Sequence, residues 1–126
     1  MKVRIQENLL FISATLTFRN QTLTLDRVVL DTGSAGTLFQ IDRVAEIGLV
    51  VGDDDQVDSI FGVGGTEVIA YKRIDRLNVG EFRVDNFEVQ VGAMEYAPDL
   101  DGILGLDFLL RVGAVIDLAN LELRSD

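Results

Sequence analysis

Two side chains on which many enzymes depend are missing from this chain of 126 residues. Without cysteine it cannot contain a disulfide bond, a thiol nucleophile or cysteine-ligated zinc. Without histidine it cannot hydrolyse a substrate through a Ser-His or Cys-His pair, and the common histidine metal sites are excluded. If the protein is an enzyme, its proton transfers therefore depend mainly on carboxylates, lysine or tyrosine.

Basic side chains are also scarce, with 11 Lys and Arg against 21 Asp and Glu and a formal net charge of −10. Nucleic acids and anionic membrane surfaces are bound by basic surfaces, so we expect neither as the main partner. The longest uncharged stretch, 8–18, is too short to cross a bilayer. Residues 1–5 lack the hydrophobic core of a signal peptide. We expect a soluble protein, cytoplasmic if the chain is complete.

Strand patterns dominate a chain that is apolar enough, at 48%, to bury one core. Apolar and polar residues alternate over 10–18, Asn20-Gln21 suggests a turn, and a second strand ends in the apolar run 28–30. The same patterns predict strands over 57–61, 66–79, 87–91, 114–118 and 121–124, and short helices over 41–47 and 106–111. We therefore expect one mostly β domain, residues 1–126, with two short helices.

The second strand runs directly into Asp31-Thr32-Gly33-Ser34, and an acid at the end of an apolar strand is poorly solvated. Gly33 allows the backbone to bend with a positive φ and brings N–H groups close to the carboxylate. We expect Thr32 to hold the turn, and Ser34 to donate a further hydrogen bond to Asp31. On these residues alone, the simpler interpretation is an Asx-turn in which Asp31 only caps its own loop.

Two more motifs follow. Phe61-Gly62-Val63-Gly64-Gly65 joins two predicted strands with more glycine than a tight turn needs, which suits a hairpin that opens and closes. An ordinary glycine turn is the alternative. Later, Gly102-Ile103-Leu104-Gly105 predicts a short apolar strand that leads into a helix. Here the glycine at 105 indicates close packing against a neighbouring segment.

Together these motifs resemble those of aspartic proteases. The run 30–34 resembles their active-site loop, and Ser34 is closer to the two-lobed pepsins than to retroviral enzymes, which usually have Ala. The runs 60–65 and 102–109 resemble the flap tip, and the strand and helix behind the loop, of the single-domain retropepsin-like branch. The run 35–49 is similar to the retropepsin-like domain of eukaryotic ubiquitin-shuttle proteins. The resemblance covers about 10–123.

The resemblance implies a single-lobe, closed β-barrel with one or two short helices and a flap hairpin. It implies an aspartic endopeptidase that needs no metal or organic cofactor and acts on a peptide or protein substrate. Asp31, Thr32, Gly33 and Ser34 would form the catalytic loop. Substrate would bind under a flap formed by Phe61, Gly62, Val63, Gly64 and Gly65. Apolar walls of the substrate site are expected at Leu30, Ala35, Val63 and Ile103.

Aspartic-protease chemistry needs two carboxylates that share one proton, and this chain has one Asp-Thr-Gly. Asp107 does not suit the second position, because it begins the second predicted helix. A homodimer would supply the missing acid by placing Asp31 of each subunit on a two-fold axis, with Thr32 bracing the two loops. We expect the terminal strands, around 2–5 and 121–124, to complete a sheet shared between the subunits.

Two other functions are compatible with the composition. The first is a dimeric peptide-binding module of the same fold that is catalytically weak or inactive, for which loss of Asp31 would be the signature; Asp31 is present. The second is a monomeric enzyme that acts on carbohydrates or nucleotides through scattered acids. No spacing of carboxylates in the chain supports the second function.

Overall fold

A computed structural model describes residues 1–62 and 65–126 of the chain. In the described part the chain forms ten strands, two short α-helices and one 3₁₀ turn. In chain order these are β1 (Arg4–Gln6), β2 (Leu9–Phe18), β3 (Gln21–Leu30), β4 (Leu38–Gln40), α1 (Ile41–Val44), η1 (Ala45–Ile47), β5 (Val57–Gly62), β6 (Gly65–Val79), β7 (Phe82–Gly92), β8 (Gly102–Leu104), α2 (Leu106–Val112), β9 (Val115–Asp117) and β10 (Glu122–Arg124). The prediction of a mostly β domain with two short helices is confirmed.

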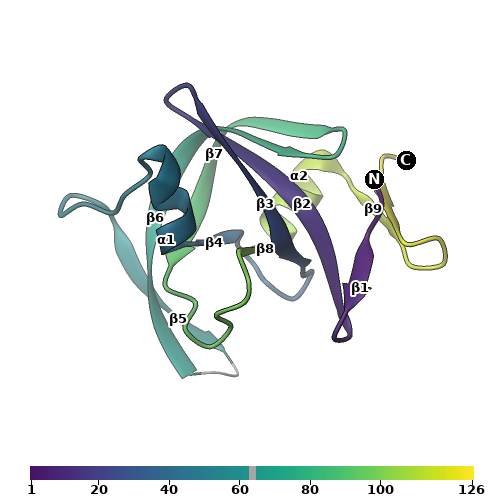
Figure 1. Ribbon diagram of the computed structural model, residues 1–126, viewed down its shortest axis with the longest axis horizontal. Coiled ribbons are helices and arrows are strands. Elements are labelled where there is room, and N and C mark those ends of the chain that lie inside the picture. The colour runs from purple at the N-terminus through teal and green to yellow at the C-terminus, as the bar shows by residue number, and fades with distance from the viewer. Residues whose placement is uncertain (63–64) are drawn as a thin grey trace.

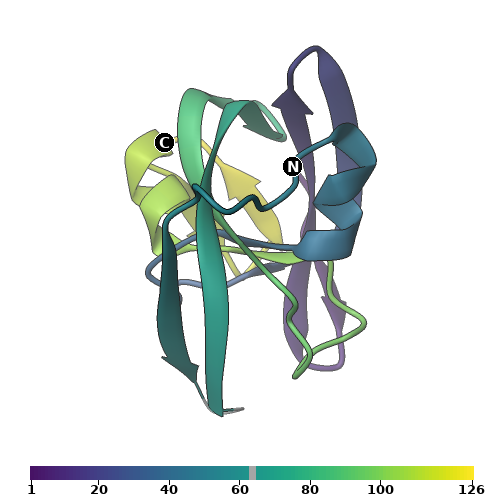
Figure 2. The same ribbon diagram turned by 90° about the vertical axis from the view of Figure 1, so that its left-hand side faces the viewer.

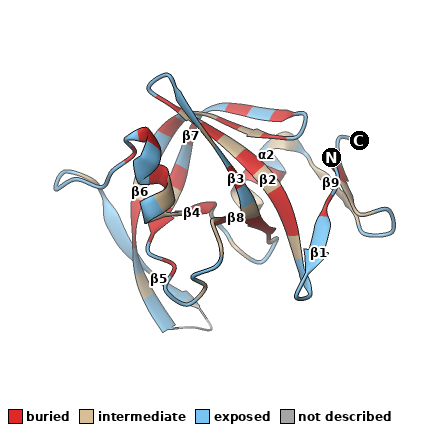
Figure 3. Cartoon of the chain, in the orientation of Figure 1, coloured by how far each residue is buried: buried red, intermediate tan, exposed pale blue. Residues whose placement is uncertain are grey.

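The main sheet closes on itself (Figures 1 and 2). Its strands follow the order β1-β2-β3-β8-β4-β7-β6-β5, and β6 also pairs with β2, which joins the two sides into a ring. Most neighbours are antiparallel, but β8 lies parallel to β3, and β4 lies parallel to β7. Buried residues recur along the strands of the ring (Figure 3) and include Leu16, Leu25 and Leu77, and Phe108 of α2 belongs to the same hydrophobic core. The predicted closed barrel is therefore confirmed.

The first hairpin shows the predicted alternation with two differences. Its turn lies at Arg19-Asn20, one residue earlier than predicted, where φ is 47° and 68°. Two successive residues with positive φ give the turn a twist that matches the paired strands. The register between β2 and β3 shifts between Ile12 and Ala14. Both Phe11 and Ile12 are fully buried beside this shift, although strict alternation places Phe11 on the polar face.

Both predicted helices are present and end at glycines in the left-handed conformation. The 41–47 segment is divided into α1 and η1, and it ends at Gly48 with φ of 80°. The side chain of Gln40 caps its start by accepting a hydrogen bond from the Arg43 N–H at 2.9 Å. Helix α2 ends at Gly113 with φ of 63°. Within the described residues, no helix has the length and apolar character needed to cross a membrane.

The two chain ends pair with each other within one chain. The Val3 N–H donates to the Leu121 carbonyl, and the Leu123 N–H donates to the Met1 carbonyl, each at 2.9 Å. Strand β10 in turn pairs with β9, and the termini lie close together in Figure 1. The terminal segments are therefore bonded to each other within a single chain, and the sheet shared between subunits stays a prediction.

Close backbone approach at β8 requires glycine at position 102. A Cβ atom there would lie 2.7 Å from the Leu38 carbonyl oxygen and 2.7 Å from the ring of Phe39. Because the first of these is a backbone atom of the adjacent strand β4, it cannot rotate away. The seam between β8 and β4 therefore has no room for a side chain at this position.

We predict that Gly102→Ala lowers the free energy of unfolding by about 1–3 kcal/mol, because the added methyl group forces the two strands apart. Equilibrium unfolding in urea measures this change. Gly52→Ala is the matched control, since a Cβ atom at Gly52 would come no closer than 3.8 Å to any neighbour. Equal stability of the two variants would contradict the seam interpretation.

Candidate active site

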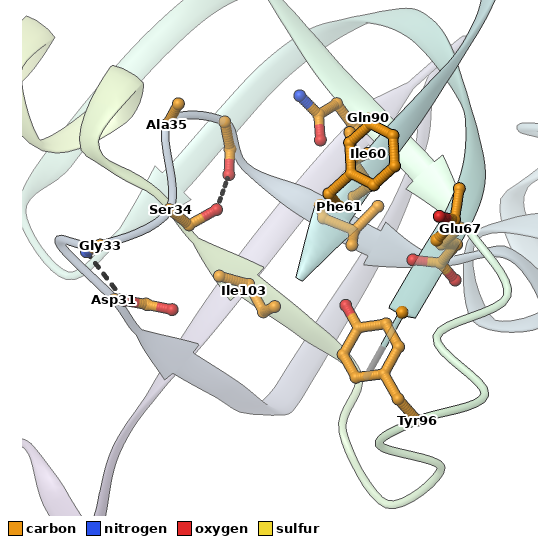
Figure 4. Close-up of a pocket in the computed structure, with 14 residues that line it drawn as sticks. Asp31, Gly33, Ser34, Ala35, Ile60, Phe61, Glu67, Gln90, Tyr96 and Ile103 are labelled. Atoms are coloured by element: carbon orange, nitrogen blue, oxygen red, sulfur yellow. Dashed lines mark hydrogen bonds between the residues drawn. The ribbon is translucent and has the colours of Figure 1, made fainter. Parts of the chain in front are cut away.

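Asp31 lies directly after β3, and backbone hydrogen bonds fix its position. Its N–H donates to the Leu104 carbonyl at 3.0 Å, which continues the pairing of β3 with β8 by one residue. Its Oδ1 accepts from the Gly33 N–H at 2.8 Å (Figure 4), and its carbonyl accepts from the Ser34 N–H at 3.2 Å. Gly33 thus brings its N–H to the carboxylate, as predicted, but the positive φ expected of it was wrong, because Gly33 is not among the residues with positive φ. The carboxylate is held in place by its own turn.

Ser34 and Thr32 behave differently from the prediction. The Ser34 hydroxyl donates to the Gly36 carbonyl at 2.8 Å, so the expected bond from this hydroxyl to the Asp31 carboxylate was wrong. The Gly36 carbonyl, two positions further along the loop, is the acceptor that this hydroxyl uses instead. Thr32 is exposed, and no hydrogen bond from it occurs within 1–62 and 65–126. The Asp31 carboxylate, rather than Thr32, therefore holds the turn.

A buried network supports the loop from behind. The fully buried Thr37 hydroxyl donates to Asp107 Oδ1 at 2.7 Å and accepts from the Gly105 N–H at 3.0 Å. Asp107 Oδ2 accepts from the Thr37 N–H at 3.2 Å, and Oδ1 also accepts from the Phe108 N–H at 2.8 Å. These contacts give Asp107 a structural role at the start of α2, as its sequence position suggests.

The loop also packs on Gly105 without an intervening side chain. The Leu106 N–H donates to the Ser34 carbonyl at 2.7 Å. A Cβ atom at Gly105 would lie 2.3 Å from the Gly36 carbonyl oxygen and 2.9 Å from that of Ser34. The predicted close-packing role of Gly105 is therefore confirmed, and the start of α2 lies directly beneath the loop.

A cleft of about 710 Å³ opens in front of Asp31. It lies between the 31–36 loop, the hairpin of β5 and β6, and the segment after β7 (Figure 4). The residues that line it are Asp31, Gly33, Ser34, Ala35, Gly36, Leu38, Ile60, Phe61, Gly65, Thr66, Glu67, Gln90, Tyr96 and Ile103. The cleft thus brings the Asp31 loop and the predicted flap strands to one site.

Several predicted wall residues have a clear outcome. Ala35 and Ile103 line the cleft, as predicted. Leu30 does not, because it is a core residue with 7% of its surface exposed. Val63 and Gly64, which the flap prediction included, lie outside the described residues.

Sequence reasoning missed four polar residues of the cleft, namely Thr66, Glu67, Gln90 and Tyr96. A signal existed for Glu67, because it stands two residues before the buried Ile69 on β6 and so shares its face. Burial, and then the nearby charge of Glu67, raise the pKa of Tyr96 above its usual value. The charged residues that line the cleft, Asp31 and Glu67, are both acidic. In the described part of the chain, no group of three or more acidic side chains could hold a metal ion.

Comparison with known proteins agrees with this geometry. The family model described as "Aspartyl protease" matches residues 14–108. A solved structure, that of a retropepsin-like aspartic protease from Rickettsia conorii, superposes with a TM-score of 0.68 at 18% sequence identity, covering 98% of this chain and 95% of that one. The structural match shows a shared retropepsin-like fold. A search of curated protein sequences gave no significant match, so the likeness to ubiquitin-shuttle proteins stays a prediction.

Thr37→Val tests the buried network. Valine keeps the shape of threonine but removes the hydroxyl, which leaves the Gly105 N–H and one Asp107 oxygen without that partner. We expect the free energy of unfolding to fall by about 1–3 kcal/mol in urea titrations. Thr15→Val is the control, because the Thr15 hydroxyl bonds only to the hydroxyl of Thr24 at an exposed position; it should change stability by no more than about 0.5 kcal/mol. A loss no larger than that of the control would show that the network contributes little.

Proposed function

The chain belongs to the aspartyl protease family, and from this premise we propose that it is an endopeptidase in which Asp31 activates the water that cleaves a peptide bond. The observation that carries the proposal is the position of the Asp31 carboxylate, which lines a cleft with room for a peptide and is held by its own turn. Thr32, Gly33 and Ser34 complete the catalytic loop.

The proposed reaction needs two neighbouring carboxylates and one proton. The ionised carboxylate takes a proton from water, whose oxygen attacks the scissile carbonyl carbon, while the protonated one donates a hydrogen bond to the carbonyl oxygen. Collapse of the tetrahedral intermediate breaks the C–N bond, and the leaving nitrogen receives the proton that was taken from water, so the pair again holds one proton. Because like charges so close together cannot both ionise, the pair holds a single proton between them.

We propose that the second carboxylate is Asp31 of a second copy of the chain. Asp107 is bonded to Thr37 behind the loop, and Glu67 lies on the opposite wall of the cleft (Figure 4), so neither suits the role. The exposed side chain of Thr32 is free to meet the partner loop across a two-fold axis. The second edge of β9 pairs with no strand of the described chain, so it can extend the terminal sheet into a partner.

The substrate in this proposal is an extended peptide covered by the hairpin of β5 and β6. An extended peptide pairs with exposed backbone groups as an added strand and places alternate side chains in pockets. Phe61, the last residue but one of β5, has 84% of its surface exposed and also lines the cleft, which suits contact with bound peptide. With Gly62, Val63, Gly64 and Gly65 it would form the substrate-binding flap.

Asp31→Asn removes the ionisable group and preserves its shape. We expect at least a hundredfold loss of peptide cleavage, about the contribution of general-base catalysis, with unfolding and oligomeric state unchanged. Cleavage of a peptide library, followed by mass spectrometry, measures the loss. Asp54→Asn, the same change in an exposed loop, serves as the control. Near wild-type cleavage by Asp31→Asn would refute the assignment, and a dimeric wild type that cuts nothing would support the inactive peptide-binding module.

The equilibrium between monomer and dimer gives a second test of the proposed function. Since one chain supplies half of the proposed dyad, specific activity should fall when dilution converts dimers into monomers. Added salt should strengthen the dimer, because it screens repulsion between chains that each carry a net charge of −10. Sedimentation run beside the activity assay measures both effects. Specific activity that stays constant after the protein has become monomeric would refute the hypothesis that Asp31 of two chains forms the catalytic pair.

A further inference from the structure

We infer that Glu67 makes this cleft select peptides that carry a basic side chain. The inference rests on the proposed peptidase function and names the class of substrate that the cleft favours. Three independent features of the described residues support it, namely the position of the carboxylate, its unused oxygen, and the charge of the residues around it.

The Glu67 carboxylate is fixed at the cleft wall opposite Asp31 (Figure 4). Glu67 stands on β6, and its Oε1 accepts a hydrogen bond from the Met94 N–H, in the segment that follows β7. A Cβ atom at Gly92 would lie 3.3 Å from the same carboxylate, so glycine at that position leaves it room. The charge therefore has a defined place, between the hairpin and the segment after β7.

The second oxygen of this carboxylate is unused. Oε2 of Glu67 is shielded from solvent and has no hydrogen-bond partner within 1–62 and 65–126. Buried side-chain oxygens nearly always have a partner, since leaving one without a donor is costly. Because the residue lines the cleft, a donor carried by a bound peptide is well placed to bond to Oε2 after a small adjustment of the side chains that shield it.

The surroundings favour a cationic donor over a neutral one. No lysine or arginine is among the described residues that line the cleft, so the Glu67 charge meets no counter-ion there. A charge screened from water attracts an opposite charge more strongly than an exposed one does. The half-exposed ring of Tyr96 lies on the same wall and offers a π face to a cation. An acidic substrate side chain would be repelled by both Glu67 and Asp31.

Paired peptides test the inference. Two peptides that differ only by lysine or norleucine share the length and apolar stem of the side chain but differ in charge. The substitution is placed in turn at each position flanking the cleaved bond, and kcat/KM is measured for both. At one position we expect the wild type to prefer lysine by about tenfold or more, and Glu67→Gln to lose that preference, so that its kcat/KM values for the lysine and norleucine peptides become similar.

Asp58→Asn is the matched control. Asp58 is an exposed acid of β5 that accepts a hydrogen bond from the Tyr71 hydroxyl at 3.2 Å and does not line the cleft. Like Glu67→Gln, the Asp58→Asn variant removes one negative charge from the hairpin of β5 and β6, but it should keep the lysine preference. Glutamine at 67 retains an acceptor for the Met94 N–H, so both variants should unfold like the wild type. A wild type without a lysine preference at any position, or a preference that survives Glu67→Gln, would overturn the inference.

A binding measurement distinguishes a failure of this inference from a failure of the proposed function. Fluorescence anisotropy with the same peptides and Asp31→Asn measures selectivity of the cleft with no need for cleavage. Tighter binding of the lysine peptide that is lost in the Asp31→Asn, Glu67→Gln double variant would support the role of Glu67 even if the wild type cut no peptide. Equal binding of lysine and norleucine peptides would overturn it even if the wild type were an active protease.

Discussion

The buried hydroxyl of Thr37 is the contact on which the arrangement of the site depends. It donates to Asp107 and accepts from the Gly105 N–H, so one oxygen atom joins the end of the 31–37 loop to the start of α2. The Asp31 turn depends on this contact, because the backbone of the loop is hydrogen-bonded to β8 at Asp31 and packs directly on Gly105 further along. A carboxylate on a loop is thereby held by a β-strand and a helix.

Closure of the barrel explains why this support is rigid. Strand β8 is only three residues long, but it lies between β3 and β4, both of which belong to the closed ring. A short strand bonded on both edges cannot shift without breaking hydrogen bonds to two neighbours. The absence of a side chain at Gly102 and Gly105 then allows main chain to pack on main chain. The position of Asp31 is thus fixed by the whole closed ring of strands.

Local features of the site could be predicted from sequence, whereas its long-range contacts could not. The Asp31 turn and the glycine stop at Gly113 each depend on neighbours in the chain. The choice of Ser34 between the Asp31 carboxylate and the Gly36 carbonyl depends on the path of the loop, which no periodicity encodes. Strand alternation places Glu67 on the inner face, but its bond to the Met94 N–H depends on a segment 27 positions away.

Strand β6 belongs to both the barrel and the hairpin over the cleft, which makes the hairpin a cantilever in mechanical terms. From Ile69 to Val79 it is clamped by β7, whereas its first four residues, 65–68, pair only with β5. At about 3.3 Å per residue, the free arm is about 13 Å long. Bending stiffness falls steeply with the free length of a beam, so the point where β7 stops pairing sets how far residues 65–68 bend under a given load. The Glu67 bond to Met94 lies beyond that clamp and acts as a second, weaker support.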